Sequence, residues 1–402
     1  MRKSFKATIG ASCVGYFTQA ILINFPPLLF VSFQREFGLS LGQLSLLIAM
    51  NFITELLVDV ICSKISPKVG FRPCVICAQL MAIIGLVSFT ALPSMMSNKL
   101  LALSIANIFC GIGGGMMEVL ISPIVEACPT TNKSGMMSLL HSFYCWGQMG
   151  VVLLSTIYFL VFSVDDWRIL SLIWAIIPLI DGILFMLVPI NSLDEEGKTS
   201  SFSSLFKNKV FWILFVMMLC AGSSEIAISQ WASTFAETGL GVEKWIGDLV
   251  GPCLFAVAMG ATRVFFSKKS EKLNLETAIL ISACFTVFSY LVVVFSPIPQ
   301  IALIGCALCG VGCGILWPGS FSIATSRIPH GGVAMFGLLA LAGDLGCLTG
   351  PVIAGLASET FGGNLSIGFL FAMAMPVLLV IMVLWLKSIK KARIYKNKDT
   401  IA

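Results

Sequence analysis

Long apolar segments alternate with short polar loops along the whole chain. Most of these segments reach the roughly 20 residues that an α-helix needs to cross the hydrocarbon core of a bilayer. Because only helices satisfy their own backbone within one such segment, the pattern predicts an all-α membrane protein with twelve transmembrane helices. The predicted spans are 8–32, 41–62, 74–93, 100–123, 134–162, 169–190, 210–235, 246–266, 276–296, 299–325, 333–357 and 366–387.

One long polar segment, 191–209, interrupts this pattern between the sixth and seventh spans. It predicts an N-terminal six-helix bundle over 1–190, a cytoplasmic linker over 191–209, and a C-terminal six-helix bundle over 210–402 that ends in a basic cytoplasmic tail. Each bundle is therefore expected to contain half of the spans.

The two predicted halves resemble each other in sequence. The segment Cys110–Gly115 (CGIGGG) recurs as Cys309–Gly314 (CGVGCG), and at the same offset Gly147 corresponds to Gly346. A repeat of about half the chain length in an apolar protein indicates two pseudo-symmetric bundles. That architecture is typical of a carrier whose halves rock around a central site.

Composition supports a membrane protein and excludes several other classes. The 402 residues are 57% hydrophobic and only 11% charged, whereas soluble domains have roughly 25% charged residues. The net charge of +5 does not indicate nucleic-acid binding, because the basic residues lie in short loops between apolar segments. Their concentration on alternate loops predicts a multi-pass protein with both termini in the cytoplasm. The compact loops and the lack of a targeting extension favour the plasma membrane.

The cysteines and histidines do not indicate a metal site. Most of the 14 cysteines lie inside apolar segments, where they act as small packing residues. His141 and His330 are the only histidines, which excludes a His-rich site. No phosphate loop, nucleophile elbow or cofactor motif is present, so we expect neither an enzyme nor ATP-driven transport, and no cofactor.

Glu118 is the most informative charged residue within a predicted span. Helical spacing places it on one face with Gly111, Gly115 and Ser122. Because burying a carboxylate in a membrane is costly, Glu118 must pair or function. It is expected to carry a proton or to accept substrate hydroxyl groups, and a structural pair with a neighbouring helix is the alternative.

The fifth span carries a polar stripe of His141, Tyr144 and Gln148, which we expect to face a central cavity. His141 can titrate near neutral pH or serve as a hydrogen-bonded structural residue. Asn24 precedes Pro26–Pro27 in the first span, where the prolines should kink or break the helix and free backbone groups.

The second half offers a complementary set of polar and aromatic residues. Glu225, Gln230 and Trp231 lie within two turns of the seventh span, and Trp317 replaces Glu118 in the repeat. An indole can stack on the apolar face of a sugar ring or simply fill the core. Asp344 in the eleventh span is either a second proton site or a structural partner.

The remaining charges are expected to act in gating or helix pairing. Glu55 and Asp59 share one face of the second span, and Arg263 lies in the eighth. Lys64 and Arg72 belong to the loop between the second and third spans.

Six plus six helices, a parallel repeat and a central linker resemble the major facilitator superfamily. The loop between the second and third spans is similar to that superfamily's signature, with Asp59, Ser63 and Lys64 followed by Gly70-Phe71-Arg72. The glycine and the aspartate of the signature are absent here, which weakens the gating role that the resemblance implies for this loop.

Within the superfamily, the polar residues resemble the fucose permease-like group of sugar:proton symporters. Glu118 with Ser122-Pro123 and His141 with Gly147 match motifs of the fourth and fifth spans. The resemblance also covers residues of the later spans, namely Glu225, Trp231, Gly260 and Arg263. It implies that Glu118 is the protonatable residue linked to substrate binding. The carboxylate that the group places in the first span is absent.

These observations predict a secondary active transporter that moves a small polar solute, a sugar or polyol, by alternating access and proton symport. Its partners would be the solute, protons and the lipid bilayer, and the protein would act as a monomer. The predicted substrate-binding residues are Asn24, Glu118, His141, Tyr144, Gln148, Glu225, Gln230, Trp231 and Trp317. The predicted proton-coupling residues are Glu118, His141 and Asp344.

Two alternatives remain open from the sequence. The first is a proton-coupled exporter of drugs or metabolites, whose cavity would be broader and more apolar. The second is a non-transporting membrane receptor, which a long soluble appendage would favour.

Overall fold

The computed structural model describes residues 5–129, 133–190, 205–269, 274–328 and 332–399. In this part of the chain the secondary structure is helical, and twelve helical segments are long and apolar enough to cross a membrane. The predicted all-α membrane fold with twelve spans is thus confirmed. Most of the predicted linker, 191–204, lies outside the described residues.

The helices of the first half are α1 (Phe5–Asn24), η1 (Pro26–Leu29), α2 (Phe30–Phe37), α3 (Leu41–Val69), α4 (Phe71–Met95), α5 (Lys99–Glu126), α6 (Lys133–Val161), η2 (Val164–Asp166), α7 (Trp167–Trp174) and α8 (Ile176–Leu187). Those of the second half are α10 (Lys209–Thr234), η3 (Phe235–Gly239), α11 (Lys244–Asp248), η4 (Leu249–Cys253), α12 (Leu254–Lys269), α13 (Leu275–Phe295), α14 (Pro299–Cys313), α15 (Leu316–Arg327), α16 (Gly332–Thr360), α17 (Leu365–Ala372) and α18 (Ala374–Asp399).

The first span is broken at the two prolines, as predicted. Helix α1 ends at Asn24, a short 3₁₀ turn covers Pro26–Leu29, and α2 continues to Phe37. Pro26 and Pro27 have no backbone N–H, so they cannot complete the helical hydrogen bonds to the carbonyl groups of Leu22 and Ile23. The break therefore leaves two carbonyl oxygens that need other partners.

Glycine contacts repeat between the halves. In the first half Gly111 lies against the backbone of α3 and Gly113 against that of α4. In the second half Gly310 lies against the backbone of α12 and Gly312 against that of α13, at equivalent positions of the repeat. The sequence repeat thus preserves close backbone approaches, which only residues without a side chain permit.

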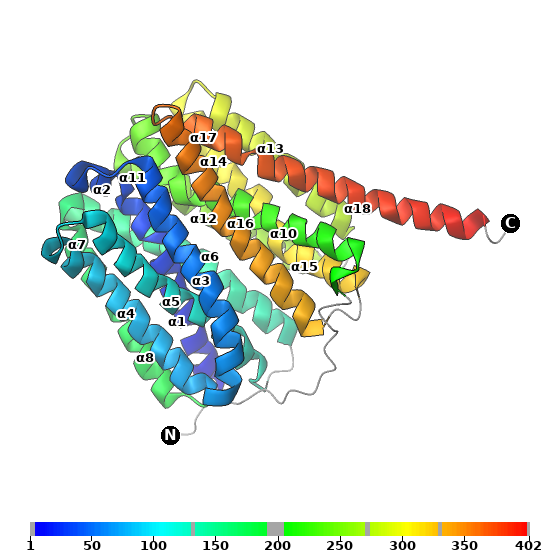
Figure 1. Ribbon diagram of the computed structural model, residues 1–402, viewed down its shortest axis with the longest axis horizontal. Helices are drawn as coiled ribbons and strands as arrows, with labels where there is room; N and C mark the ends of the chain where they lie inside the picture. Colours follow the sequence, from blue (N-terminus) through cyan, green and yellow to red (C-terminus); the bar gives the residue numbers. More distant parts are fainter. Residues whose placement is uncertain (1–4, 130–132, 191–204, 270–273, 329–331, 400–402) are drawn as a thin grey trace.

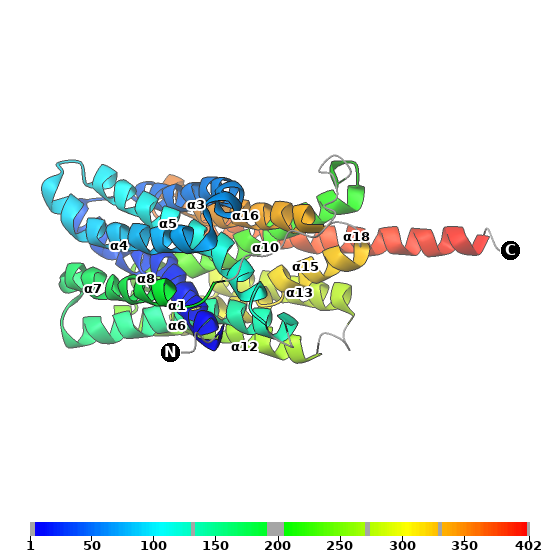
Figure 2. The same cartoon turned by 90° about the horizontal axis from the view of Figure 1, so that it is seen from below.

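The halves meet along two pairs of helices. Helix α3 packs along α16, and α6 packs along α12, while the other extensive contacts lie within each half. Figure 1 shows α3 and α16 side by side across the middle of the molecule, and Figure 2 shows the same pair from below. A polar residue on any of these four helices can therefore lie at the seam between the halves.

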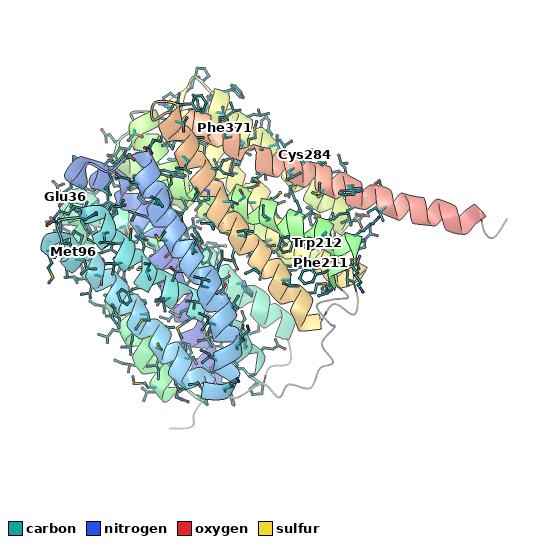
Figure 3. All side chains as sticks on the ribbon, viewed as in Figure 1. Glu36, Met96, Phe211, Trp212, Cys284 and Phe371 are labelled. Carbon is teal, nitrogen blue, oxygen red and sulfur yellow. The ribbon has the colours of Figure 1, made fainter. Side chains whose placement is uncertain are left out.

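Large apolar side chains cover the outer surface. Phe371 is 48% and Trp212 is 45% exposed, and both lie on the outside of the helices in Figure 3. An apolar surface of this extent suits lipid rather than water.

The loop charge Arg72 is structural in this fold. Its guanidinium donates hydrogen bonds to the carbonyl oxygens of Phe185, Met186 and Val188, each at 2.7 Å. These carbonyls belong to the last turn of α8, where a cation compensates the negative helix end. Arg72 therefore ties the start of α4 to the end of α8.

Replacing Gly310 with alanine should destabilise the protein. A methyl group on Gly310 would lie 2.2 Å from the carbonyl oxygen of Phe255, so α12 and α14 would have to separate. Overpacking of this kind costs about 1–3 kcal/mol, and we expect a lower thermal unfolding temperature in detergent. Gly337→Ala is the matched control, because nothing lies within 4 Å of that position. Equal unfolding temperatures for the two variants would contradict the close packing.

Candidate functional site

Many polar residues within the spans contact one another, some of them across the two halves. We call the end where α8 ends and α10 begins the linker end, and the opposite one the distal end. Glu118 on α5 is half-buried, and Gln19 on α1 donates a hydrogen bond from Nε2 to Glu118 Oε2 at 2.9 Å. Gln19 itself is only 3% exposed. This amide fixes the orientation of the Glu118 carboxyl group.

A second polar contact lies close to Glu118. The hydroxyl of Tyr16 is 3.2 Å from Ser122 Oγ and 3.3 Å from His141 Nδ1. Ser122 follows Glu118 by one turn of α5, so α1, α5 and α6 all contribute to one group of polar side chains. We call Tyr16, Gln19, Glu118, Ser122 and His141 the carboxyl cluster.

Access to this region increases toward the linker end. Along the predicted stripe on α6, Gln148 is buried, Tyr144 is half-buried and His141 is exposed. Asn24 is 5% exposed and donates to Tyr144 Oη at 3.4 Å. The site is therefore reached from the linker end and covered toward the distal end.

The second half contributes an ion pair. Arg263 on α12 lies 3.3 Å from Glu225 on α10, and its Nε donates to the carbonyl oxygen of Gly314 at 3.3 Å. The Arg263 side chain is 19% and that of Glu225 9% exposed. Trp317 on α15 is half-buried and packs over Gly343, next to Asp344.

Carboxyl groups of both halves meet at the seam. Asp59 on α3 and Asp344 on α16 interact electrostatically across the seam. Glu55, one turn from Asp59, is 4% exposed, and its Oε1 has no hydrogen-bond partner among the described residues.

Two predicted substrate residues join the halves directly. Gln148 Nε2 on α6 donates to Ser229 Oγ on α10 at 2.7 Å. Gln230 Nε2 on α10 donates to the carbonyl oxygen of Ile23 at 3.1 Å. Ile23 has one of the two carbonyls that the proline break leaves without a helical partner, so Gln230 completes the backbone bonding of α1.

The distal end is closed by charged residues. Lys244 Nζ donates to the carbonyl oxygen of Leu28 at 2.7 Å and lies 3.1 Å from Asp248 Oδ2. Asp248 also accepts hydrogen bonds from Ser233 and from Thr156 on α6, the latter at 3.5 Å. We call Leu28, Thr156, Ser233, Lys244 and Asp248 the distal latch.

A second distal contact joins α16 to α3. The carboxylate of Glu359 near the end of α16 accepts hydrogen bonds from Ser40 Oγ, at 3.1 Å, and from the backbone N–H of Gly42. Ser40 is the N-cap of α3, so the carboxylate lies at the positive end of that helix.

Trp231 does not join the other predicted substrate residues. Its indole is fully buried, contacts Phe30 with ring centroids 5.2 Å apart, and donates to the carbonyl oxygen of Pro351 at 2.9 Å. We therefore leave Trp231 out of the proposed site. Lys64 is exposed near the linker end of α3.

Several residues were missed from the sequence. Tyr16 and Gln19 lie three residues apart on α1, a spacing that puts both on one helix face. Lys244 and Asp248 have the i, i+4 spacing of a helical ion pair. Glu359 has no comparable local pattern, because its partners lie more than 300 residues away.

Comparisons with solved structures show the fold. A single-residue variant of the E. coli fucose:proton symporter FucP is 17% identical, with a TM-score of 0.64 over 94% of this chain and 98% of that one. A mutant of the nucleoside transporter NupG is 12% identical, with a TM-score of 0.76 over 94% and 98% of the two chains. A D-xylose-proton symporter is 17% identical, with a TM-score of 0.71 over 94% and 95%.

No curated protein sequence matches this chain. The sequence profile of the Major Facilitator Superfamily matches residues 8–349 and 254–401, which together cover nearly the whole chain. A match of this extent, on a fold of twelve membrane-spanning helices, indicates a transporter rather than an enzyme. The chain belongs to the Major Facilitator Superfamily.

Proposed function

We propose that this transporter carries a small polar solute, a sugar or polyol, together with a proton. The observation that carries the proposal is the carboxyl cluster, in which Glu118 lies beside hydroxyl, amide and imidazole groups and is reached from the linker end. Such groups match the hydroxyl groups of a polyol, which donate and accept hydrogen bonds.

The proposed solute lies between the two halves. Asn24, Glu118, His141, Tyr144 and Gln148 would contact it from the first half. Glu225, Gln230 and Trp317 would contact it from the second half, and Trp317 would supply an aromatic surface for the ring. The solved sugar:proton symporters with the same fold support this choice of solute class.

Glu118 is the proposed proton carrier. When it is protonated, the membrane-buried site is neutral and the occupied protein can reorient between its two faces. When it loses the proton, its hydrogen bonds to the solute change and the solute is released. His141 and Asp344 are the further proposed proton sites.

The proposed orientation places the linker end in the cytoplasm of a cell whose plasma membrane contains the protein. The basic residues of the loops support this orientation, because positive charge accumulates on the cytoplasmic side. In this arrangement the structure is closed toward the outside and the carboxyl cluster is reached from the cytoplasm. The proposed unit is the monomer, with the predicted bundle limits of 1–190 and 210–402.

Uptake of a panel of radiolabelled sugars, polyols and nucleosides into proteoliposomes tests the proposal. We expect an inward proton gradient to drive accumulation of one sugar or polyol above its external concentration. Failure to accumulate any of these solutes, with proton-driven efflux of apolar cations instead, would support the exporter. Nucleoside accumulation would retain proton symport and correct the solute class, which the solved nucleoside transporter of the same fold makes a specific alternative.

A further inference from the structure

Two exposed aromatic side chains lie together at the start of α10, on the outer surface of the linker end. Phe206 and Trp212 are each 45% exposed, and their ring centroids are 5.7 Å apart. The Trp212 indole donates a hydrogen bond to the carbonyl oxygen of Phe206 at 2.9 Å. We call Phe206 and Trp212 the aromatic platform. Figure 3 labels Trp212 at this end of the helices.

The chain that precedes α10 is held against the helix by buried neighbours. Leu205 is 2% exposed, and the fully buried Phe211 meets Phe206 edge-on, with ring centroids 6.0 Å apart. Asn208 caps α10, because its Oδ1 accepts from the N–H of Val210 at 2.9 Å. The platform is therefore ordered by the protein itself, and a ligand that binds there does not have to order it.

Two lysines flank the cap of α10. Lys207 and Lys209 stand on either side of Asn208, and both are exposed. Neither belongs to an ion pair of the described residues. The sequence from 197 to 224 contains three lysines and no acidic residue. The platform thus has positive charge beside it that the neighbouring sequence does not balance.

The platform lies where a membrane span begins. The span starts at Lys209, and Trp212 follows three residues later on the same helix face. The apolar surface continues to Phe215, whose ring centroid is 5.5 Å from that of Trp212. Aromatic side chains concentrate at the boundary between hydrocarbon and headgroups, and lysines near the end of a span extend to the headgroups. An amphiphile with an anionic head and an apolar chain matches both parts of this surface.

The charge favours an anionic phospholipid over other ligands. A free anion would contact the lysines and leave the aromatic platform uncovered. A zwitterionic phospholipid would cover the platform, but its own cation would lie near the two ammonium groups and weaken the attraction. An anionic phospholipid has the phosphate and the acyl chain without the opposing cation.

We propose that the start of α10 binds one anionic phospholipid, with its phosphate between Lys207 and Lys209 and an acyl chain against Phe206 and Trp212. From this end α10 runs along α16 and carries Glu225 to the centre of the protein. The bound lipid therefore holds the outer end of a helix that reaches the candidate site. Its binding requires neither proton coupling nor a sugar substrate, so it stands apart from the proposed function.

Fluorescence quenching by phospholipids that are brominated near the headgroup end of their acyl chains tests the site. The full-length protein is placed in phosphatidylcholine vesicles that contain increasing fractions of brominated phosphatidylglycerol or of brominated phosphatidylcholine. Because the chain has eight tryptophans, the signal of Trp212 is taken as the difference between the unsubstituted protein and Trp212→Phe. We expect half-quenching of this signal at an about tenfold lower fraction of phosphatidylglycerol than of phosphatidylcholine. Raising NaCl from about 0.1 M to about 0.5 M should reduce this preference.

The double variant Lys207→Gln/Lys209→Gln should lose the preference, so that both brominated lipids quench Trp212 equally. The matched control is Lys64→Gln/Lys68→Gln, which removes the same charge from two exposed lysines at the linker end of α3. This control should keep the preference. Each variant is compared with its own Trp212→Phe counterpart.

Three results would overturn the proposal. The first is equal quenching of Trp212 by the two lipids in the unsubstituted protein. The second is an equal loss of preference in both lysine variants, which would indicate diffuse attraction to the whole linker end. The third is displacement of phosphatidylglycerol by inorganic phosphate at constant ionic strength, which would assign the lysines to a soluble anion. Glu118→Gln should be quenched as the unsubstituted protein is, so this test and that of proton coupling fail independently.

Discussion

Replacing Glu118 with glutamine should abolish proton-driven accumulation of the solute while leaving its exchange across the membrane intact. Glutamine keeps the size of the side chain and retains an oxygen that can accept the hydrogen bond from Gln19 Nε2. It cannot ionise, so the protein would stay in the state that the proton normally produces. The solute should then equilibrate, with an inside-to-outside ratio near one in place of a gradient. Proteoliposome uptake with a proton gradient measures the first effect, and counterflow without a gradient measures the second.

Glu276→Gln is the matched control for this substitution. Glu276 forms an ion pair with Arg327 near the linker end, away from the carboxyl cluster. We expect it to lower protein yield or stability while retaining accumulation. Loss of both accumulation and exchange in Glu118→Gln would identify Glu118 as a structural residue and would contradict its proposed role.

Replacing Lys244 with methionine should open the distal end. The substitution removes the hydrogen bond to Leu28 and leaves Asp248, which is fully buried, without its cation. Breaking a buried ion pair by removing one partner costs about 3–5 kcal/mol. Opening the distal end would hydrate Asp248 and so recover part of this free energy. The ratio of open to closed protein should therefore rise by about a hundredfold. Hydrogen–deuterium exchange of segments 26–37 and 235–250 should increase.

The double variant Lys244→Met/Asp248→Asn distinguishes opening from general destabilisation. Without the unpaired carboxylate, much of the energetic cost disappears, and exchange in the two distal segments should return toward that of the unsubstituted protein. A uniform increase of exchange throughout the helices in the single variant would indicate loss of fold stability. Unchanged exchange would show that the distal latch does not hold the halves together.

The spans could be predicted from the sequence because the membrane imposes a minimum length of apolar helix. The break at Pro26–Pro27 could also be predicted, since proline removes a backbone donor wherever it occurs. The stripe of His141, Tyr144 and Gln148 follows from helical periodicity alone, and its side chains do run along one side of α6 toward the seam. These features depend on local chemistry and need no knowledge of the neighbouring helices.

The partners of the site residues could not be predicted in the same way. Gln19 and Glu118 are 99 positions apart, and nothing in either helix specifies the contact. Trp231 shows that closeness in sequence does not place two side chains together. Six residues along a helix correspond to a rotation of about 600°, so the side chains of Glu225 and Trp231 point about 120° apart. The Trp231 indole donates a hydrogen bond to the carbonyl oxygen of Pro351 instead.

The glycine contacts of the fold also predict where the chain tolerates change. Within a half, Gly111, Gly310 and Gly346 face backbone atoms of the neighbouring helix, which cannot move aside. Between the halves, Gly42 and Gly260 face side chains, those of Glu359 and Cys145. Side chains can be exchanged for smaller ones without shifting a helix. We therefore expect compensating pairs of substitutions to accumulate at the seam between the halves during divergence, whereas Gly111, Gly310 and Gly346 should remain fixed.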